Sequence, residues 1–236
     1  MEEVLKGILL DGISYGDNDK IINVFTLEKG VVSARIKGVK KAGAKLKFAT
    51  EPFCFAEYVF SCTGDRRTVI GASLLDSFYP IRLSVEKLYS ACSAVEFVKE
   101  FCKKEMVQPQ LFFSLLTALK KLAYTDENAL LPLTEFLILG LKEMGYGIKF
   151  NGCADCETDF DGRTFFDYES GSFYCYECAN GRGREINNLT YKTLRSVAEN
   201  EKLDGADYLK GLKLLDYYLT NKTEAVLKSL KQLLSL

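Results

Sequence analysis

Four cysteines in the second half of the chain have the type and spacing of metal ligands. Two Cys-x-x-Cys pairs are separated by eighteen residues, and they comprise Cys153, Cys156, Cys175 and Cys178. Four thiolates saturate a tetrahedral zinc ion and leave no open position for a catalytic water. The spacing therefore predicts one structural Zn²⁺, and a redox dithiol or another metal is the alternative.

A run of positive charge marks the first half. Residues 29–50 include seven basic side chains and no acidic one, although the whole chain is nearly neutral, with 31 basic and 32 acidic residues. A strand and a glycine-containing loop of one sign can follow the backbone of a polyanion. We expect nucleic-acid contacts from Arg35, Lys37, Lys40, Lys41, Lys45 and Lys47. A solvated surface without a ligand is the alternative.

If four or five of these charges met phosphates, log K would fall with log salt at a slope of about −3 to −4. Aromatic residues near the run could stack on bases, but residues 53–60 are apolar on both alternating faces, which favours core positions. These aromatics are Phe48, Phe53, Phe55 and Tyr58. Arg66 and Arg67 lie at an expected hairpin tip, where a solvated turn is the preferred interpretation.

Several kinds of catalysis are excluded because the chain contains no histidine. Ser-His-Asp hydrolysis, Cys-His nucleophiles and HExxH zinc sites all need an imidazole. Asp17 and Asp19 could hold a divalent ion in a nuclease, but the sequence Gly16-Asp17-Asn18 favours a turn. The segment from Gly38 to Leu46 lacks the Gly-Lys-Ser/Thr ending of a phosphate-binding loop.

The first eighty residues have the alternation and turn residues of strands. We expect strands over residues 4–13, 20–27, 31–37, 53–60 and 68–75, with Val32, Ala34 and Ile36 facing a core. Gly30 can take the positive φ of a short hairpin turn. Five short strands indicate a small closed barrel such as an OB-fold, and an SH3-like barrel fits nearly as well.

After Pro80 the apolar period becomes helical. We expect helices over residues 84–106, from Pro109 to about residue 122, over residues 130–144, and, past residue 185, over residues 189–198, 206–219 and 224–236. The fold class is α+β multidomain, with an OB-fold at residues 1–80, a helical domain in two parts at residues 81–149 and 185–236, and an inserted zinc finger at residues 150–184.

The cellular compartment is expected to be the cytoplasm. The longest apolar runs are far shorter than the ~20 residues that span a bilayer, and the start Met1-Glu2-Glu3 is acidic where a signal peptide would be basic. Thiols stay reduced in the cytoplasm, so we expect no disulfide framework. The single cysteines are interpreted as small buried hydrophobes: Cys54, Cys62, Cys92 and Cys102.

Motifs along most of the chain resemble those of a known family. The run from Tyr15 to Lys20, then Phe25-Thr26, Glu28-Lys29-Gly30, Lys37-Gly38 and a lysine-rich loop, resembles the start of bacterial RecO recombination mediators. Phe136-Leu137, Gly145-Tyr146 and the two cysteine pairs resemble that family's helical region and zinc module. The order and spacing of these motifs, from about residue 5 to residue 178, are more specific than any one of them.

This resemblance implies a DNA-binding protein of recombinational repair that catalyses no covalent chemistry. It implies binding to single- and double-stranded DNA, annealing of complementary strands and, together with RecR, loading of RecA on DNA coated with single-strand-binding protein. The implied partners also include the C-terminal tail of single-strand-binding protein, and the implied location is the cytoplasm, at the nucleoid during repair.

Overall fold

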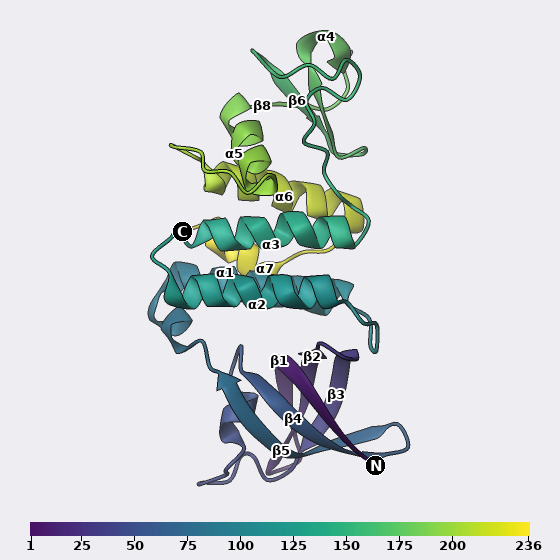
Figure 1. Ribbon diagram of the computed structural model, residues 1–236, viewed down its shortest axis with the longest axis vertical. Coiled ribbons are helices and arrows are strands. Elements are labelled where there is room, and N and C mark those ends of the chain that lie inside the picture. The colour runs from purple at the N-terminus through teal and green to yellow at the C-terminus, as the bar shows by residue number, and fades with distance from the viewer. The chain divides into compact units, whose positions relative to one another are not determined.

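The computed structural model describes residues 1–236, and these divide into two compact units (Figure 1). The first unit contains residues 1–84 and 95–125, and the second contains residues 85–94 and 126–236. Helix α1, Val85–Phe101, contributes residues to both units. No helix is long and apolar enough to cross a bilayer.

Five strands of the first unit form a closed barrel. They are β1 (Glu2–Tyr15), β2 (Asp19–Thr26), β3 (Gly30–Ile36), β4 (Phe55–Thr63) and β5 (Arg66–Asp76). Their order around the barrel is β1-β2-β3-β5-β4, and the β3–β5 pairing that closes it is parallel while the other pairings are antiparallel. The expected small barrel of the OB type is confirmed.

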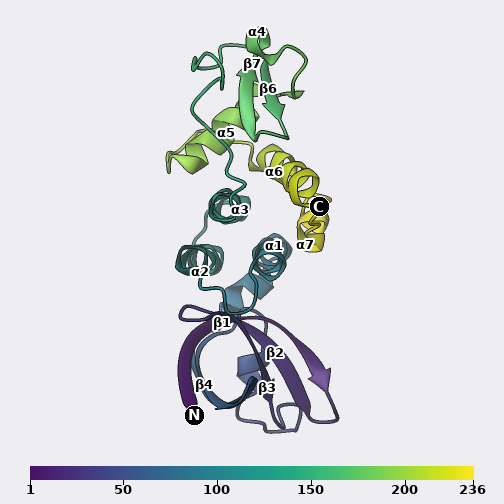
Figure 2. The same ribbon diagram turned by 90° about the vertical axis from the view of Figure 1, so that its right-hand side faces the viewer.

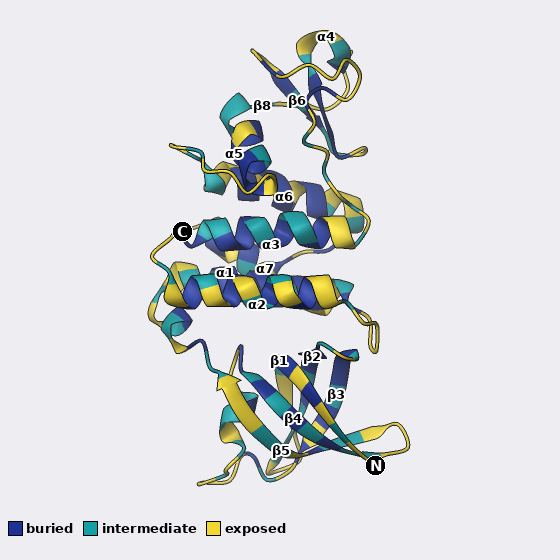
Figure 3. Cartoon of the chain, viewed as in Figure 1, coloured by how far each residue is buried: buried dark blue, intermediate teal, exposed yellow.

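The barrel encloses an apolar core, and buried and exposed residues alternate along its strands (Figure 3). On β3, Val32, Ala34 and Ile36 are buried in this core, as the sequence predicts. Val31, expected on the outer face, is also buried. It forms an isolated bridge with Lys104, so a returning segment covers that side of β3.

Besides part of α1, the first unit contains two 3₁₀ helices and one complete α-helix. They are η1 (Lys47–Thr50), η2 (Tyr79–Leu83) and α2 (Pro109–Tyr124). Pro109 is the first residue of α2, where its missing N–H is not needed. Phe112 of α2 packs on Phe25 and Phe55 of the barrel, with ring centroids 5.5 and 6.2 Å apart. Burying these rings fixes α2 against the strands.

Helix α1 ends earlier than the sequence predicts. The apolar period suggests a helix to residue 106, but α1 stops at Phe101, and Glu105 has a φ of 59°. The backbone N–H of Glu105 donates to the carbonyl of Val31 at 3.1 Å. This hydrogen bond to β3 takes the place of the helical hydrogen bond that the sequence predicts for the N–H of Glu105.

The second unit combines helices with a small sheet. Its helices are α3 (Leu130–Glu143), α5 (Asn188–Ala198), α6 (Tyr208–Thr223) and α7 (Lys228–Leu233), and α3 packs beside α6 (Figure 2). Between α3 and α5 lie β6 (Thr164–Asp167), β7 (Ser172–Cys175), the short helix α4 (Tyr176–Ala179) and β8 (Arg184–Ile186). The sheet order is β7-β6-β8.

Aromatic side chains attach this small sheet to the helices. Phe166 meets Tyr218 of α6 at 5.6 Å, and Phe160 and Phe173 meet Tyr191 of α5 at 4.7 and 4.8 Å between ring centroids. The hydroxyl of Tyr191 donates to the carbonyl of Phe150 at 3.1 Å. The sheet thus shares an aromatic core with α5 and α6.

The last helix is shorter than expected. The sequence predicts a helix over residues 224–236, but α7 covers only Lys228–Leu233. Glu224 has a φ of 62°, which ends α6, and Leu227 is extended. Ala225 and Leu227 are both buried. Residues 224–227 therefore reach the core as a non-helical segment, which the apolar period alone did not reveal.

Gly30 provides a test of the barrel's packing. It has a φ of +66°, and an added Cβ would lie 2.1 Å from the backbone oxygen of Met106. We expect Gly30→Ala to lower the free energy of unfolding by about 2–4 kcal/mol, through backbone strain and overpacking. Gly43→Ala is the control, since Gly43 has a φ of +75° with no atom within 4 Å, and about 1 kcal/mol is expected. Urea unfolding measures both, and equal losses would contradict the close approach.

Candidate nucleic-acid interface and metal centre

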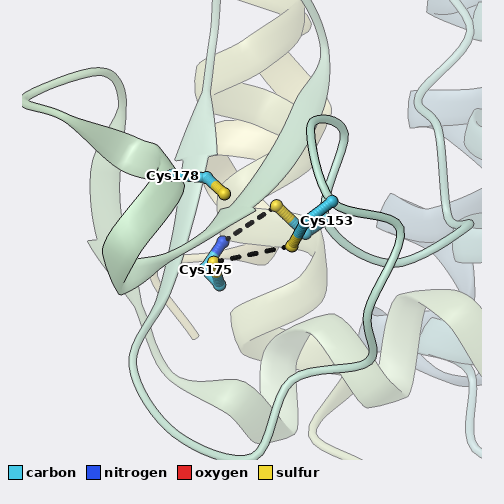
Figure 4. A group of neighbouring side chains, drawn as sticks. Cys153, Cys175 and Cys178 are labelled. Atoms are coloured by element: carbon cyan, nitrogen blue, oxygen red, sulfur yellow. Dashed lines mark hydrogen bonds between the residues drawn. The ribbon is translucent and has the colours of Figure 1, made fainter.

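The four paired cysteines come together in the second unit. Cys153 and Cys156 lie in the loop before β6, Cys175 ends β7, and Cys178 belongs to α4. Their sulfur atoms all lie within 4.8 Å of one another, and Cys156 Sγ and Cys175 Sγ are 3.9 Å apart. Figure 4 shows three of these side chains, Cys153, Cys175 and Cys178, close together. The structure therefore brings together the residues that the spacing predicts, close enough to bind a metal ion.

Backbone contacts shape the loop that carries the first pair. The N–H of Cys153 donates to the carbonyl of Thr158 at 3.0 Å, and the N–H of Glu157 donates to the carbonyl of Cys153 at 2.8 Å. The N–H of Ala154 donates to the carbonyl of Phe173 on β7 at 2.8 Å. These bonds close the loop and fix it beside the strand that leads to the second pair.

The thiols of the cluster are electrostatically unequal. Burial opposes ionisation of Cys153, but backbone N–H groups of Cys156, Cys175 and Asp155 outweigh it and lower its pKa to about 6. Hydrogen bonds with Cys175 and Cys156 raise the pKa of Cys178. Four sulfurs this close cannot all ionise without a cation between them, so the donor set fits a thiolate-bound metal ion.

The expected nucleic-acid contacts all lie on the surface of the barrel. We call Arg35, Lys37, Lys40, Lys41, Lys45 and Lys47 the basic surface, and every one of these side chains is exposed. Arg35 belongs to β3, Lys37 to Lys45 lie in the following loop, and Lys47 begins η1. Val39 is buried and anchors the loop, and the N–H of Lys40 donates to the carbonyl of Asn18 at 3.0 Å.

Carboxylates of the barrel neutralise two of the seven charges in residues 29–50. Lys29 pairs with Glu3 at 2.5 Å, and Arg35 donates to Asp19 Oδ2 at 2.7 Å through Nε and 2.5 Å through Nη2. The remaining five form no ion pair: Lys37, Lys40, Lys41, Lys45 and Lys47. The basic surface thus keeps most of its charge for a ligand.

Asp19 has a structural role that the sequence did not indicate. Its Oδ1 accepts the backbone N–H of Gly38 at 2.7 Å while Oδ2 accepts Arg35. The Gly38 bond, followed by Arg35, lowers the pKa of the Asp19 carboxyl from its ordinary value. Both oxygens are therefore occupied, which argues against the nuclease alternative.

A cleft next to the basic surface contains residues that the sequence analysis missed. It has a volume of about 490 Å³ and is lined by Tyr15, Ile21, Ser33, Arg35, Lys37 and the hairpin residues Asp65, Arg66 and Arg67. Arg66 is exposed, whereas Arg67 pairs with Glu105 at 2.8 Å. Only the pairing of the strands brings Tyr15 beside Arg35, so no local pattern could have indicated it.

The aromatic residues near the basic run lie in or against the core, as expected. Phe53 and Tyr58 are buried, and Phe48 and Phe55 are half-buried. The Tyr58 hydroxyl donates to the carbonyl of Ala49 at 3.3 Å. None of the four is presented on the surface as an open ring.

Fold and site together define a class: a protein with an OB-type barrel, a helical region and a four-cysteine metal centre. Residues 1–78 match the family model described as Recombination protein O N terminal, and residues 82–231 match the one described as Recombination protein O C terminal. The chain therefore belongs to the RecO family of DNA repair proteins.

Curated relatives agree with this assignment, and each is named DNA repair protein RecO. The protein of Acetivibrio thermocellus is 28% identical over 197 residues, covering 83% of this chain and 78% of the relative. The protein of Dehalococcoides mccartyi is 30% identical over 199 residues, with the same coverage. The protein of Bacillus subtilis is 26% identical over 174 residues, covering 73% of this chain and 67% of the relative.

The role of Asp19 predicts a pH dependence. A carboxyl with a lowered pKa stabilises the fold when ionised, and this contribution is lost as the pH falls below the ordinary value of 3.8. We expect Asp19→Asn to lower the urea midpoint at pH 6, and the difference from the unmodified protein to shrink as the pH falls from 4.5 to 2.5.

Asp17→Asn is the matched control, because Asp17 is an exposed neighbour in the preceding turn. Its substitution should leave the urea midpoint unchanged at every pH. A pH-independent difference for Asp19→Asn would show that the carboxylate does not stabilise the loop through its charge.

Proposed function

We propose that this RecO-family protein binds single- and double-stranded DNA through Arg35, Lys37, Lys40, Lys41, Lys45 and Lys47. The observation that carries the proposal is the set of five exposed lysines without ion pairs in the loop after β3 and at the start of η1. Such a surface suits a phosphate backbone, since each contact releases condensed counterions. Gly38 and Gly43, both with positive φ, give the lysine-rich loop backbone conformations that other residues rarely adopt, so the loop can fit along a DNA backbone.

The proposed activity is annealing of complementary strands and, with RecR, loading of RecA on DNA coated with single-strand-binding protein. Annealing requires that phosphates be neutralised while base edges remain free to pair. Lysines on flexible stems meet that requirement better than a deep aromatic cleft. No step of this activity requires covalent chemistry, so we propose that the protein is not an enzyme.

The four cysteines are proposed to bind one structural Zn²⁺. With Zn–S distances of ~2.3 Å, the sulfurs of a tetrahedral site lie ~3.8 Å apart, and the 3.9 Å between Cys156 and Cys175 supports that ion. Bound zinc would supply fixed geometry and folding energy to a segment with little core of its own. Cys153, Cys156, Cys175 and Cys178 would be its ligands.

We propose that each domain of the chain has a separate role. Residues 1–80 would bind DNA, residues 81–149 and 185–236 would form one helical domain, and residues 150–184 would be the zinc finger. Residues 150–184 contain seven carboxylates and three arginines, which disfavours a phosphate ligand there. We propose a bracing role for the finger, and action in the cytoplasm, at the nucleoid during repair.

An adaptor that binds only proteins is the second candidate. The excess of carboxylates on the zinc finger favours it, because such a surface suits a basic protein partner better than DNA. Binding to RecR or to the tail of single-strand-binding protein, together with no DNA binding at low salt, would support this candidate over the first.

Charge reversal at two lysines tests DNA binding. We expect Lys40→Glu with Lys41→Glu to weaken single-strand binding by at least tenfold at low salt and to reduce the slope of log K against log salt by about 1.4. Fluorescence anisotropy with a labelled oligonucleotide measures both, and annealing of strands coated with single-strand-binding protein should slow in parallel.

Lys192→Glu with Lys202→Glu makes the same change in net charge, at exposed positions of the second unit. This control should bind and anneal like the unmodified protein. Equal losses in the two double variants would mean that only net charge matters and that the basic surface is not the binding site.

Metal analysis tests the zinc assignment. Protein purified without chelator should contain about one zinc per chain, and Cys175→Ser should lower the zinc content and the thermal midpoint. Cys62→Ser, outside the cluster and half-buried, should keep the metal. Full stability after complete zinc removal would contradict a structural role.

A further inference from the structure

The outer face of the barrel carries an apolar strip beside the basic surface. Strand pairing places Ile13 opposite Ile21, and Ile21 opposite Arg35, in one row across β1, β2 and β3. Tyr15 lies two residues after Ile13 on β1, and therefore on the same face. Ile13 is 65% exposed and Tyr15 is 48% exposed. Apolar and cationic side chains are thus adjacent on one open sheet face.

Tyr15 is held in place by its neighbours and remains accessible. The guanidinium carbon of Arg35 lies 4.9 Å from the centre of the Tyr15 ring, and Arg35 itself is fixed by Asp19. A cation over one face of a ring leaves the other face for a second planar group. The ring also lines the cleft of about 490 Å³ that Lys37 and Arg66 border.

An unpaired base with its phosphate has the complementary chemistry for this face. Bases stack on aromatic rings regardless of sequence, and their phosphates need cations within reach. Of the charged residues that border the cleft, Lys37 and Arg66 form no ion pair, while Asp65 is the carboxylate on the rim. The strip is also continuous with the basic surface through Arg35 and Lys37.

We propose that Tyr15 is a stacking platform for an unpaired base of single-stranded DNA bound on the basic surface. This inference rests on the proposed function and adds to it a contact that distinguishes the forms of DNA. A duplex keeps its bases stacked inside, so it reaches only the lysines. A single strand reaches the lysines and Tyr15 together.

The second unit offers a matched tyrosine that should not bind DNA. Tyr176 is 62% exposed, and the guanidinium carbon of Arg163 lies 4.8 Å from its ring centre. Arg163 is paired with Glu185 through two hydrogen bonds of 2.9 and 2.6 Å, and the surrounding zinc finger is acidic. Tyr176 thus resembles Tyr15 in having a tyrosine ring beside an arginine, but the negative electrostatic potential around it repels phosphate.

Tryptophan substitution reports stacking directly because the chain contains no tryptophan. The fluorescence of Tyr15→Trp should fall by about half or more on titration with oligo-dT, and should change little with heparin, a polyanion without bases. Tyr176→Trp should show no quenching with either. Quenching that is equal for oligo-dT and heparin, or equal at positions 15 and 176, would overturn the proposal.

Affinity provides a second readout. Alanine substitution of a stacking aromatic ring lowers affinity about five- to hundredfold, so we expect that loss for single-stranded DNA with Tyr15→Ala and less than twofold for a duplex. Tyr15→Phe keeps the ring and should bind normally. Urea midpoints close to that of the unmodified protein would show that the variants are folded.

These experiments distinguish failure of base stacking on Tyr15 from failure of DNA binding by the basic surface. If the protein binds DNA in a lysine-dependent manner while Tyr15→Ala binds equally well and Tyr15→Trp is not quenched, the stacking contact is wrong and the proposed function stands. If the unmodified protein binds no DNA at low salt, both are wrong.

Discussion

The carboxylate of Asp19 organises the surface on which the proposed DNA contacts lie. One oxygen accepts the N–H of Gly38, where the lysine-rich loop leaves β3, and the other holds Arg35. Through Arg35 the same carboxylate fixes the position of the Tyr15 ring. The start of the loop and the cleft therefore depend on a single anionic group. Asp19 is the first residue of β2, and both of its carboxylate oxygens accept hydrogen bonds from the barrel. These bonds explain the presence of an aspartate here without a catalytic role.

The four-cysteine cluster and the aromatic contacts join residues 150–184 to their surroundings in different ways. Phe160, Phe166 and Phe173 pack this segment against α5 and α6, and the cysteine sulfur atoms bring its loop, β7 and α4 within reach of one metal ion. A short sheet of three strands buries too little surface to close both sides by packing. We therefore expect a metal ion bound by the four cysteines to stabilise the local structure.

Local patterns in the sequence predicted much of this architecture. The core positions of Val32, Ala34 and Ile36 and the gathering of the four cysteines were predicted correctly, whereas Val31, expected on the outer face of β3, is buried. The sequence did not reveal the pairing of Arg35 with Asp19 or the cleft beside Tyr15, because these depend on strand register. The early end of α1 and the non-helical residues 224–227 result from tertiary contacts that override helical periodicity. The domain boundaries and the DNA contacts stay predictions.

The loop from Lys37 to Lys47 has a further consequence. Five like charges within eleven residues repel one another in the free protein, and a polyanion relieves that repulsion whatever bases it carries. Binding to a surface of this kind does not depend on base sequence. If two DNA strands bind there, base pairing alone selects the complementary partner, and the protein contributes no sequence preference to hybridisation.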